Sequence, residues 1–224
     1  MEELQFLQSE VLPSLLRGLK VSIALILPSA FFGVCIGVWA GATRVYGNRL
    51  FKTLANAYVA LFRGTPLVVQ LFFWYFGLPH VGIYLSPFVA SVVGFSLCSG
   101  AYQSEYVRGA LLSIKRGQLL AAQALGFTKW KMLKSIILPQ ALRRALPGCG
   151  NEIIYLIKYS SLAYMVTCIE MTGEAKILAS HYFKYTEVFL TVGAFYLALV
   201  SLASWLLHRL EGHLSLPGFE HHRN

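Results

Sequence analysis

The sequence predicts an all-α polytopic membrane protein with five transmembrane helices, and three observations support this fold class. Of its 224 residues, 56% are hydrophobic and only 13% are charged. The apolar residues form long blocks, whereas a soluble domain would show one apolar stripe on each helix. The basic residues behind the formal net charge of +9 lie between these blocks. This distribution is typical of membrane-protein loops and argues against a nucleic-acid partner.

Each apolar block reaches the ~20 residues that cross the hydrocarbon core of a bilayer. The expected spans are residues 19–42, 53–78, 87–107, 145–169 and 186–208. Inside lipid, backbone polar groups must bond within their own segment, so the spans are predicted to be helices. We expect a short periplasmic or interfacial segment at 1–16, one membrane domain at 17–212 and a cytoplasmic tail at 213–224. Glu2, Glu3 and Glu10 replace the basic start of a signal peptide, so the first span is expected to stay in the mature protein.

Loop charge predicts the orientation of these spans. Arg44, Arg49 and Lys52 follow the first span, and eight Lys and Arg residues lie between the third and fourth, whereas residues 79–86 carry none. Basic loops stay in the cytoplasm, so we expect the N-terminus outside and the C-terminus, with Arg209 and Arg223, inside. Four spans would leave a basic loop outside.

The long loop between the third and fourth spans has the pattern of a helix–turn–helix at 113–139. Ser113 can cap a helix that runs through Ala124, and Gly126 suits the left-handed position that ends a helix. Thr128 can cap a second helix, which Pro139 is expected to stop. On pattern alone, this hairpin could dock another protein or lie on the membrane surface.

The loop's residues resemble a known motif. GQLLAAQALG at 117–126 and ILPQA at 137–141 are similar to the EAA loop of ABC-importer membrane subunits. FRGTPL at 62–67, AY at 101–102 and GNE at 150–152 further resemble the polar amino acid permeases of that family. The resemblance implies a type I-like ABC importer fold with a cytoplasmic coupling helix, in the bacterial inner membrane. It also implies ABC ATPase subunits, a second permease copy or paralogue, and a periplasmic solute-binding protein as partners.

The resemblance assigns ATPase coupling to Gly117, Leu120, Ala121, Ala122 and Gly126. Leu120 departs from the family, because it stands where the Glu of the EAA motif is expected. The sequence has no G-x-x-x-x-G-K-[ST] motif, so ATP and Mg²⁺ are expected to be used by a partner chain and no cofactor by this one.

Ionisable and polar residues inside the spans are the candidates for a substrate path. They are Arg63, Thr65, Gln70, Tyr102, Gln103, Asn151, Glu152, Tyr155, Tyr159 and Ser160. Arg63 could hold a substrate carboxylate in two hydrogen bonds, or form a structural ion pair with Glu105 or Glu152. The polar and aromatic candidates could equally join helices. Many relatives carry an acidic residue where this chain has Tyr159, after Lys158, which favours a neutral or acidic amino acid.

The leading functional hypothesis is therefore uptake of a polar amino acid, energised by a separate ATPase. A self-contained secondary carrier remains an alternative. An intramembrane enzyme is a weaker one, because its clustered catalytic groups are missing from the sequence. The four cysteines are isolated, with no CxxC pair, so no metal site is expected.

Overall fold

The computed structural model describes residues 5–214 as helices joined by turns. Residues 1–4 and 215–224 lie outside the described residues, so most of the expected tail, including Arg223, is not placed. The first half of the chain forms η1 (Leu7–Val11), α2 (Leu12–Tyr46), α3 (Arg49–Gly64), α4 (Leu67–Phe72), η2 (Phe73–Gly77), η3 (Leu78–Val81) and α5 (Pro87–Leu112). The second half forms α6 (Arg116–Ala124), α7 (Lys129–Met132), η4 (Leu133–Ile137), α8 (Leu138–Tyr159), η5 (Ser160–Val166), α9 (Met171–Tyr182) and α10 (Tyr185–Leu214).

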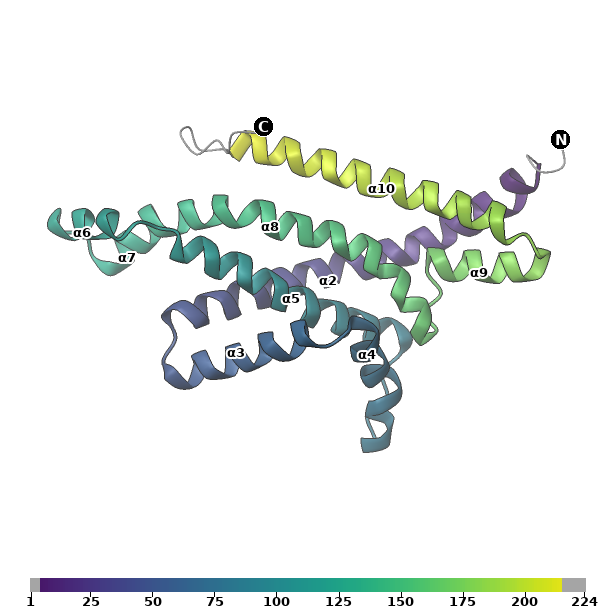
Figure 1. The fold of residues 1–224 in the computed structure, drawn as a ribbon, viewed down its shortest axis with the longest axis horizontal. Coiled ribbons are helices and arrows are strands. Elements are labelled where there is room, and N and C mark those ends of the chain that lie inside the picture. Colours follow the sequence, from purple (N-terminus) through teal and green to yellow (C-terminus); the bar gives the residue numbers. More distant parts are fainter. Residues whose placement is uncertain (1–4, 215–224) are drawn as a thin grey trace.

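The helices α2 and α5 form the centre of the molecule and pack closely along their length (Figure 1). Glycines on α2 make this approach possible. A Cβ atom at Gly37 would lie 2.5 Å from Cβ of Gln103, and one at Gly41 would lie 2.8 Å from Cβ of Val107. Small residues let helix backbones approach closely in membranes, where van der Waals packing rather than the hydrophobic effect drives association.

The helix α8 lies against α5 on one side and α10 on the other (Figure 1). Two glycines of α8 again mark the contacts. A Cβ at Gly148 would meet the ring of Tyr106 at 2.5 Å, and one at Gly150 would meet Leu207 of α10 at 2.2 Å. The neighbouring pairs are therefore α2 with α5, α5 with α8, and α8 with α10. The helices α3 and α9 pack on opposite ends of α2.

Two helical stretches are long and apolar enough to cross a membrane, residues 7–46 and 185–213. There are up to four such spans if each of two bent helix pairs counts as one. The helix α5, expected as the third span, is not among them, although it has 26 residues. It is buried at the centre and carries Ser91, Ser96, Ser99 and Ser104, which lower its hydropathy. The five-span count and the orientation stay predictions.

The expected second span is broken. The helices α3 and α4 are bent by 105° at the residues between them. Gln70 supports this break, since its Nε2 donates to the carbonyl oxygens of Phe62 (2.9 Å) and Thr65 (3.1 Å). A break frees backbone carbonyls from the helix ladder, and buried carbonyls need a donor. Gln70 supplies that donor.

Two expectations about the helix–turn–helix were confirmed and two were wrong. Gly126 has φ +77°, and the Thr128 side chain accepts from the Lys131 backbone N–H as an N-cap. Ser113 does not cap α6, because it ends α5 and its hydroxyl donates to the Ala110 carbonyl. Pro139 does not stop the helix, because the π-helical turn η4 runs directly into α8 and the helix continues through the proline.

The helix α9 was missing from the sequence-based expectations. It is only 12 residues long and begins at Glu170, whose side chain accepts from the backbone N–H groups of Thr172 and Gly173. A short helix without a long apolar block gives a weak periodicity signal.

Candidate functional site

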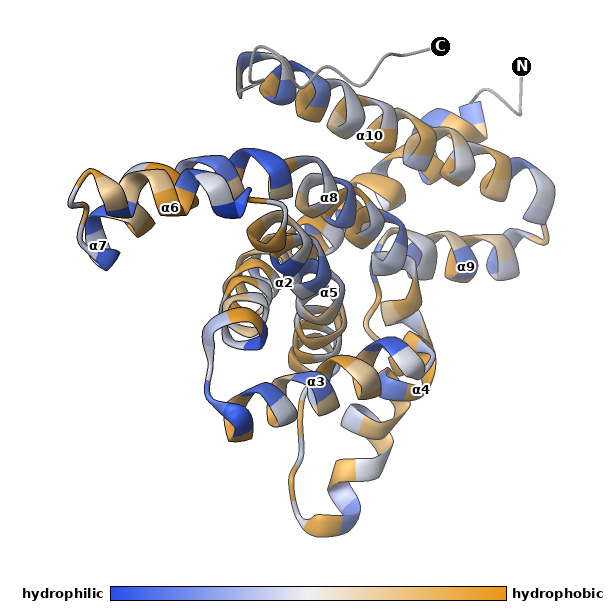
Figure 2. Cartoon of the chain, turned by 60° about the vertical axis from the view of Figure 1, so that its left-hand side comes forward, coloured by the Kyte–Doolittle hydropathy of each residue, from blue (hydrophilic) through white to orange (hydrophobic). Residues whose placement is uncertain are grey.

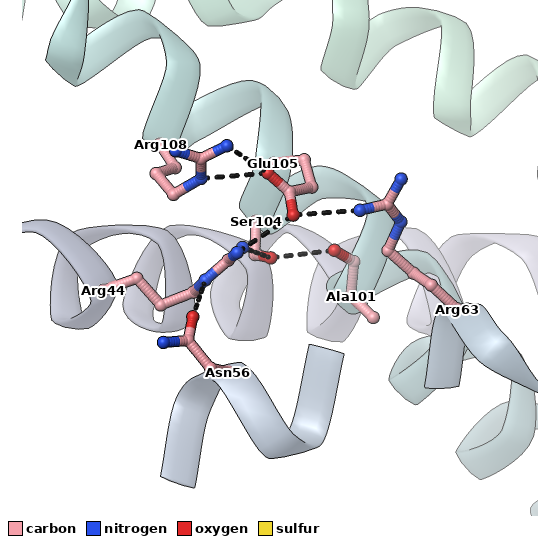
Figure 3. A network of polar contacts seen from close by, with 7 residues as sticks. All are labelled: Arg44, Asn56, Arg63, Ala101, Ser104, Glu105 and Arg108. Carbon is pink, nitrogen blue, oxygen red and sulfur yellow. Dashed lines mark hydrogen bonds and ion pairs between the residues drawn. The ribbon is translucent and has the colours of Figure 1, made fainter. Parts of the chain in front are cut away.

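Three arginines from three helices meet on one carboxylate, that of Glu105 on α5 (Figure 3). Arg44 of α2 approaches Oε1 at 3.0 Å, and Arg63 of α3 approaches the same oxygen at 2.9 Å. Arg108, one turn along α5, contacts Oε2 at 2.8 Å. We call Glu105 and these arginines the arginine cluster. It ties the C-terminal part of α2, the end of α3 and α5 together.

Arg44 is the buried member of the arginine cluster. Its side chain is 11% exposed. Its Nε donates to Oδ1 of Asn56 at 2.7 Å and its Nη1 to Oγ of Ser104 at 3.3 Å. Sequence analysis assigned Arg44 only to a basic loop, because nothing in the local pattern shows that its side chain turns back between the helices.

The structure decides between the two partners offered for Arg63. Its ion pair is with Glu105, which lies 42 positions along the chain. Its guanidinium also lies over the Tyr102 ring, 5.2 Å from the centroid. Glu105 also pairs with Arg108, so the Arg63 ion pair is part of a larger group.

A second group of candidates gathers along α5 and α8. Glu152 is 3% exposed, and its Oε1 has no hydrogen-bond partner in the described part of the chain. Tyr159 lies within electrostatic range of Glu152, Tyr102 and Tyr155, and the Tyr155 and Tyr159 rings stack at 5.8 Å. The group therefore combines a buried carboxylate with aromatic faces.

Tyr106 connects the two groups. It lies within electrostatic range of both Glu152 and Arg63, and its ring packs against Gly148 of α8. Lys158 adds a cation nearby, with Nζ 4.1 Å from the centre of the Tyr155 ring. A guanidinium and a carboxylate thus both lie within electrostatic range of Tyr106.

The remaining candidates lie elsewhere. Gln103 is 1% exposed between α2 and α5, and Ser160 is fully buried with its hydroxyl on the Ile157 carbonyl. Thr65 and Gln70 bond to each other at the break between α3 and α4. Asn151 is exposed on α8. Of these five residues, Gln103 and Ser160 lie in helix contacts, Thr65 and Gln70 lie at the break, and Asn151 is exposed.

The proposed coupling residues lie on or beside α6, at the end of the molecule where hydrophilic residues run from α7 into α8 (Figures 1 and 2). Leu120 is 54% exposed, and Ala121 is also exposed, whereas Ala122 is 4% exposed and faces inward. A Cβ at Gly117 or Gly126 would meet no atom within 4 Å. The helix is held by Gln140, which donates to Gln118 at 3.0 Å.

Glu170 is a polar residue that sequence reasoning did not single out. It is fully buried at the start of α9. It accepts hydrogen bonds from two backbone N–H groups and, on Oε2, from the hydroxyls of Tyr196 (3.0 Å) and Ser22 (3.5 Å). It joins α2, α9 and α10. The capping pattern at 170–173 was the available signal.

A helical bundle with long apolar helices, an exposed short helix at one end and charged groups between helices fits a membrane transport subunit. Residues 33–215 match the family described as binding-protein-dependent transport system inner membrane component. The chain belongs to this family, which confirms the resemblance seen in the loop at 117–126. It is a permease subunit of an ABC importer, and this family works with ATPase and binding-protein partners.

The relatives of the chain include permease proteins of amino acid transporters. The chain is 37% identical to the probable amino-acid ABC transporter permease protein YckA of Bacillus subtilis, over 90% of this chain and 89% of that protein. It is 36% identical to the glutamine transport system permease protein GlnP of Escherichia coli, over 92% and 94%. It is also 36% identical to the nopaline transport system permease protein NocM of Agrobacterium fabrum, over 89% and 90%.

Solved structures share the fold. The crystal structure of an amino acid ABC transporter with histidines aligns with a TM-score of 0.85 and 30% identity, over 90% of this chain and 94% of that one. An inward-facing MetNI methionine ABC transporter aligns with a TM-score of 0.78 at 24% identity, over 93% and 99%, and supports the fold alone.

Proposed function

We propose that this chain imports a polar, uncharged or acidic amino acid across the bacterial inner membrane. It would do so as one half of a permease pair. The observation that supports the substrate class is a partly exposed guanidinium, Arg63, and a buried carboxylate, Glu152, both within electrostatic range of Tyr106. An α-amino acid is a zwitterion, so its path needs a cation for the carboxylate and an acceptor for the ammonium group.

Glu152 suits the ammonium end of such a substrate. One of its carboxylate oxygens is buried and without a hydrogen-bond donor among the described residues. Leaving a buried charged acceptor unpaired is costly, so a donor from the substrate would be stabilising. The stacked rings of Tyr155 and Tyr159 offer faces that also attract cations.

Tyr159 bears on which charge the side chain of the substrate can carry. Since many relatives carry an acidic residue there, this path lacks one counter-charge for a cationic side chain. Lys158, 4.1 Å from the Tyr155 ring centre, adds a positive charge. Both features favour a neutral or acidic amino acid, in line with the glutamine named for the Escherichia coli relative.

In the proposed assembly the chain spans the membrane five times, with α5 as the third span and the N-terminus outside. A second copy or a paralogue completes the path, and a periplasmic solute-binding protein delivers the substrate. ATPase subunits bind at α6, bring ATP and Mg²⁺, and perform the hydrolysis, so this chain is not itself an enzyme. The exposed Leu120 and Ala121 would face the ATPase.

Ligand screening tests the substrate class. The cognate binding protein, measured by thermal shift, should be stabilised by polar amino acids. Broad stabilisation by sugars or other solutes would contradict the class, and preference for Arg or Lys would contradict only the argument from Tyr159. Uptake by proteoliposomes with and without the ATPase subunit distinguishes the importer from a self-contained carrier, which would transport without it.

A further inference from the structure

The three arginines around Glu105 are not equivalent. Arg108 lies one turn away on the same helix, so it moves together with Glu105. Arg44 is buried, and three of its nitrogens donate hydrogen bonds. Arg63 has a side chain that is 40% exposed. Within residues 5–214 it donates one hydrogen bond, from Nη1 to Glu105. Arg63 is therefore the least firmly held of the three.

Some N–H groups of Arg63 make no hydrogen bond within residues 5–214. Its Nε and Nη2 have no acceptor in the described part of the chain, and the Tyr102 ring covers the guanidinium from one face, 5.2 Å away. A guanidinium presents its N–H groups at its edge, in a fork that matches a carboxylate in two hydrogen bonds. The Arg63 side chain is also accessible, since it is 40% exposed. A second carboxylate can therefore approach.

Glu105 can release Arg63 without becoming unpaired. Arg108 would remain on Oε2 at 2.8 Å and Arg44 on Oε1 at 3.0 Å. With all three arginines present, three positive charges face one negative charge. The cluster therefore has an excess of positive charge, which an incoming carboxylate would reduce. Breaking this one ion pair costs less than breaking an isolated buried pair, which leaves a bare charge.

The position of Arg63 in the fold also permits movement. It is the last residue but one of α3, directly before the break that bends α3 and α4 by 105°. The other two arginines lie on α2 and α5, the closely packed central pair. A small change at the break would move Arg63 without disturbing that pair.

We propose that Arg63 exchanges between two carboxylates, that of Glu105 when the path is empty and the α-carboxylate of the substrate when it is occupied. Glu105 holds the place of the substrate carboxylate and keeps Arg63 from pairing elsewhere. Arg63 thereby makes the path selective for a free α-carboxylate. This inference rests on the proposed function, because it takes an amino acid as the transported substrate.

The test measures binding to the purified complex of this chain with its ATPase subunits, without the binding protein, which itself selects ligands. The probes are L-glutamine and L-glutamine amide, which differ only in the α-carboxylate. The variants are Arg63→Gln and Arg63→Lys, and Arg17→Gln is the matched control, since Arg17 also forms an ion pair from an exposed position but lies outside the arginine cluster. Thermal unfolding of each complex checks that the variants are folded.

We expect the wild type to bind L-glutamine more tightly than its amide. Arg63→Gln should weaken L-glutamine binding about tenfold to a hundredfold, the range of a charged hydrogen-bond pair, and should remove the preference over the amide. Arg63→Lys should lose part of the affinity, and Arg17→Gln should keep both affinity and preference. Equal effects of Arg63→Gln and Arg17→Gln, or an unchanged preference in Arg63→Gln, would overturn the exchange. A wild type that binds no polar amino acid would instead contradict the proposed function.

Discussion

At the scale of single residues, buried carboxylates do two different things in this protein. Glu170 has a donor for each oxygen, from the backbone of α9 and from hydroxyls of α2 and α10. Glu152 has one oxygen without a donor in the described chain. A satisfied buried carboxylate stabilises its surroundings, whereas an unsatisfied one costs free energy unless a ligand supplies the donor. We therefore assign Glu170 to structure and Glu152 to the path.

Replacing Glu170 should destabilise the protein. In Glu170→Ala the first N–H groups of α9 and the Tyr196 hydroxyl lose their acceptor inside the protein, which costs about 2–4 kcal/mol. Thermal unfolding of the purified protein measures this loss. Glu174→Ala is the control, because its ion pair with Arg17 is 3.5 Å long and the arginine is 62% exposed. That pair is worth less than about 1 kcal/mol. Equal losses in the two variants would contradict the role of Glu170.

Sequence alone could identify Arg63 and Glu152 as special, because charged residues inside apolar blocks are conspicuous. It could not choose between Glu105 and Glu152 as the partner of Arg63, because that depends on how helices distant in sequence are placed. It missed Glu170 for a related reason. The capping pattern at 170–173 indicates only a helix start, and two of the donors to Glu170 come from residues 26 and 148 positions away.

At the scale of elements, the predictions were correct where a residue's role depends only on its neighbours in the sequence. Gly126 adopts the left-handed conformation and Thr128 caps the next helix, as their residue types predict. Pro139 was misread because the residue type alone does not show that a π-helical turn precedes it and that the helix continues through the proline. Ser113 was misread because a serine can serve either end of a helix.

The turn at Gly126 should be required for coupling but not for folding. Its φ of +77° disfavours a β-branched residue, although there is open space around it. We expect Gly126→Val to reduce ATP-driven uptake severely, while insertion and expression stay normal. Gly126→Asn is the control, because asparagine tolerates this conformation and should retain most uptake. Normal uptake by Gly126→Val would refute the coupling role of the turn.

The contact between α2 and α5 should depend on individual glycines. In Gly37→Ala the new Cβ would lie 2.5 Å from Cβ of Gln103, so the helices must move apart, at a cost of about 1–3 kcal/mol. Gly109→Ala on α5 has no atom within 4 Å and should be neutral or slightly stabilising. Thermal unfolding distinguishes them, and a Gly37→Ala protein as stable as wild type would disprove the close contact.

At the scale of the whole molecule, the fold was predictable as a bundle of apolar helices, while the number of crossings was not fixed by composition. The central helix α5 has many small polar residues facing its neighbours, so it falls outside the candidate spans. A helix that faces lipid must be apolar, whereas a helix surrounded by other helices can carry small polar residues. The five-span proposal therefore depends on whether α5 crosses.

Labelling of single cysteines tests the topology in a variant without the four native cysteines. With five spans, a cysteine at Ile83, before α5, reacts with a membrane-impermeant maleimide in intact cells. One at Lys115, after α5, reacts only after permeabilisation. Both side chains are exposed, so lack of reaction reflects location. If α5 does not cross, the two cysteines will react from the same side.

The length of α2 has a mechanical consequence. Its 35 residues remain one helix through Pro28 and extend about 52 Å, which exceeds the ~40–45 Å thickness of a bilayer with its headgroups. Near one end Gly18 touches the backbone of Met171, and near the other Gly41 touches Val107. Because α2 is one unbroken helix between these contacts, an axial displacement at its contact with α9 would also shift Arg44 of the arginine cluster.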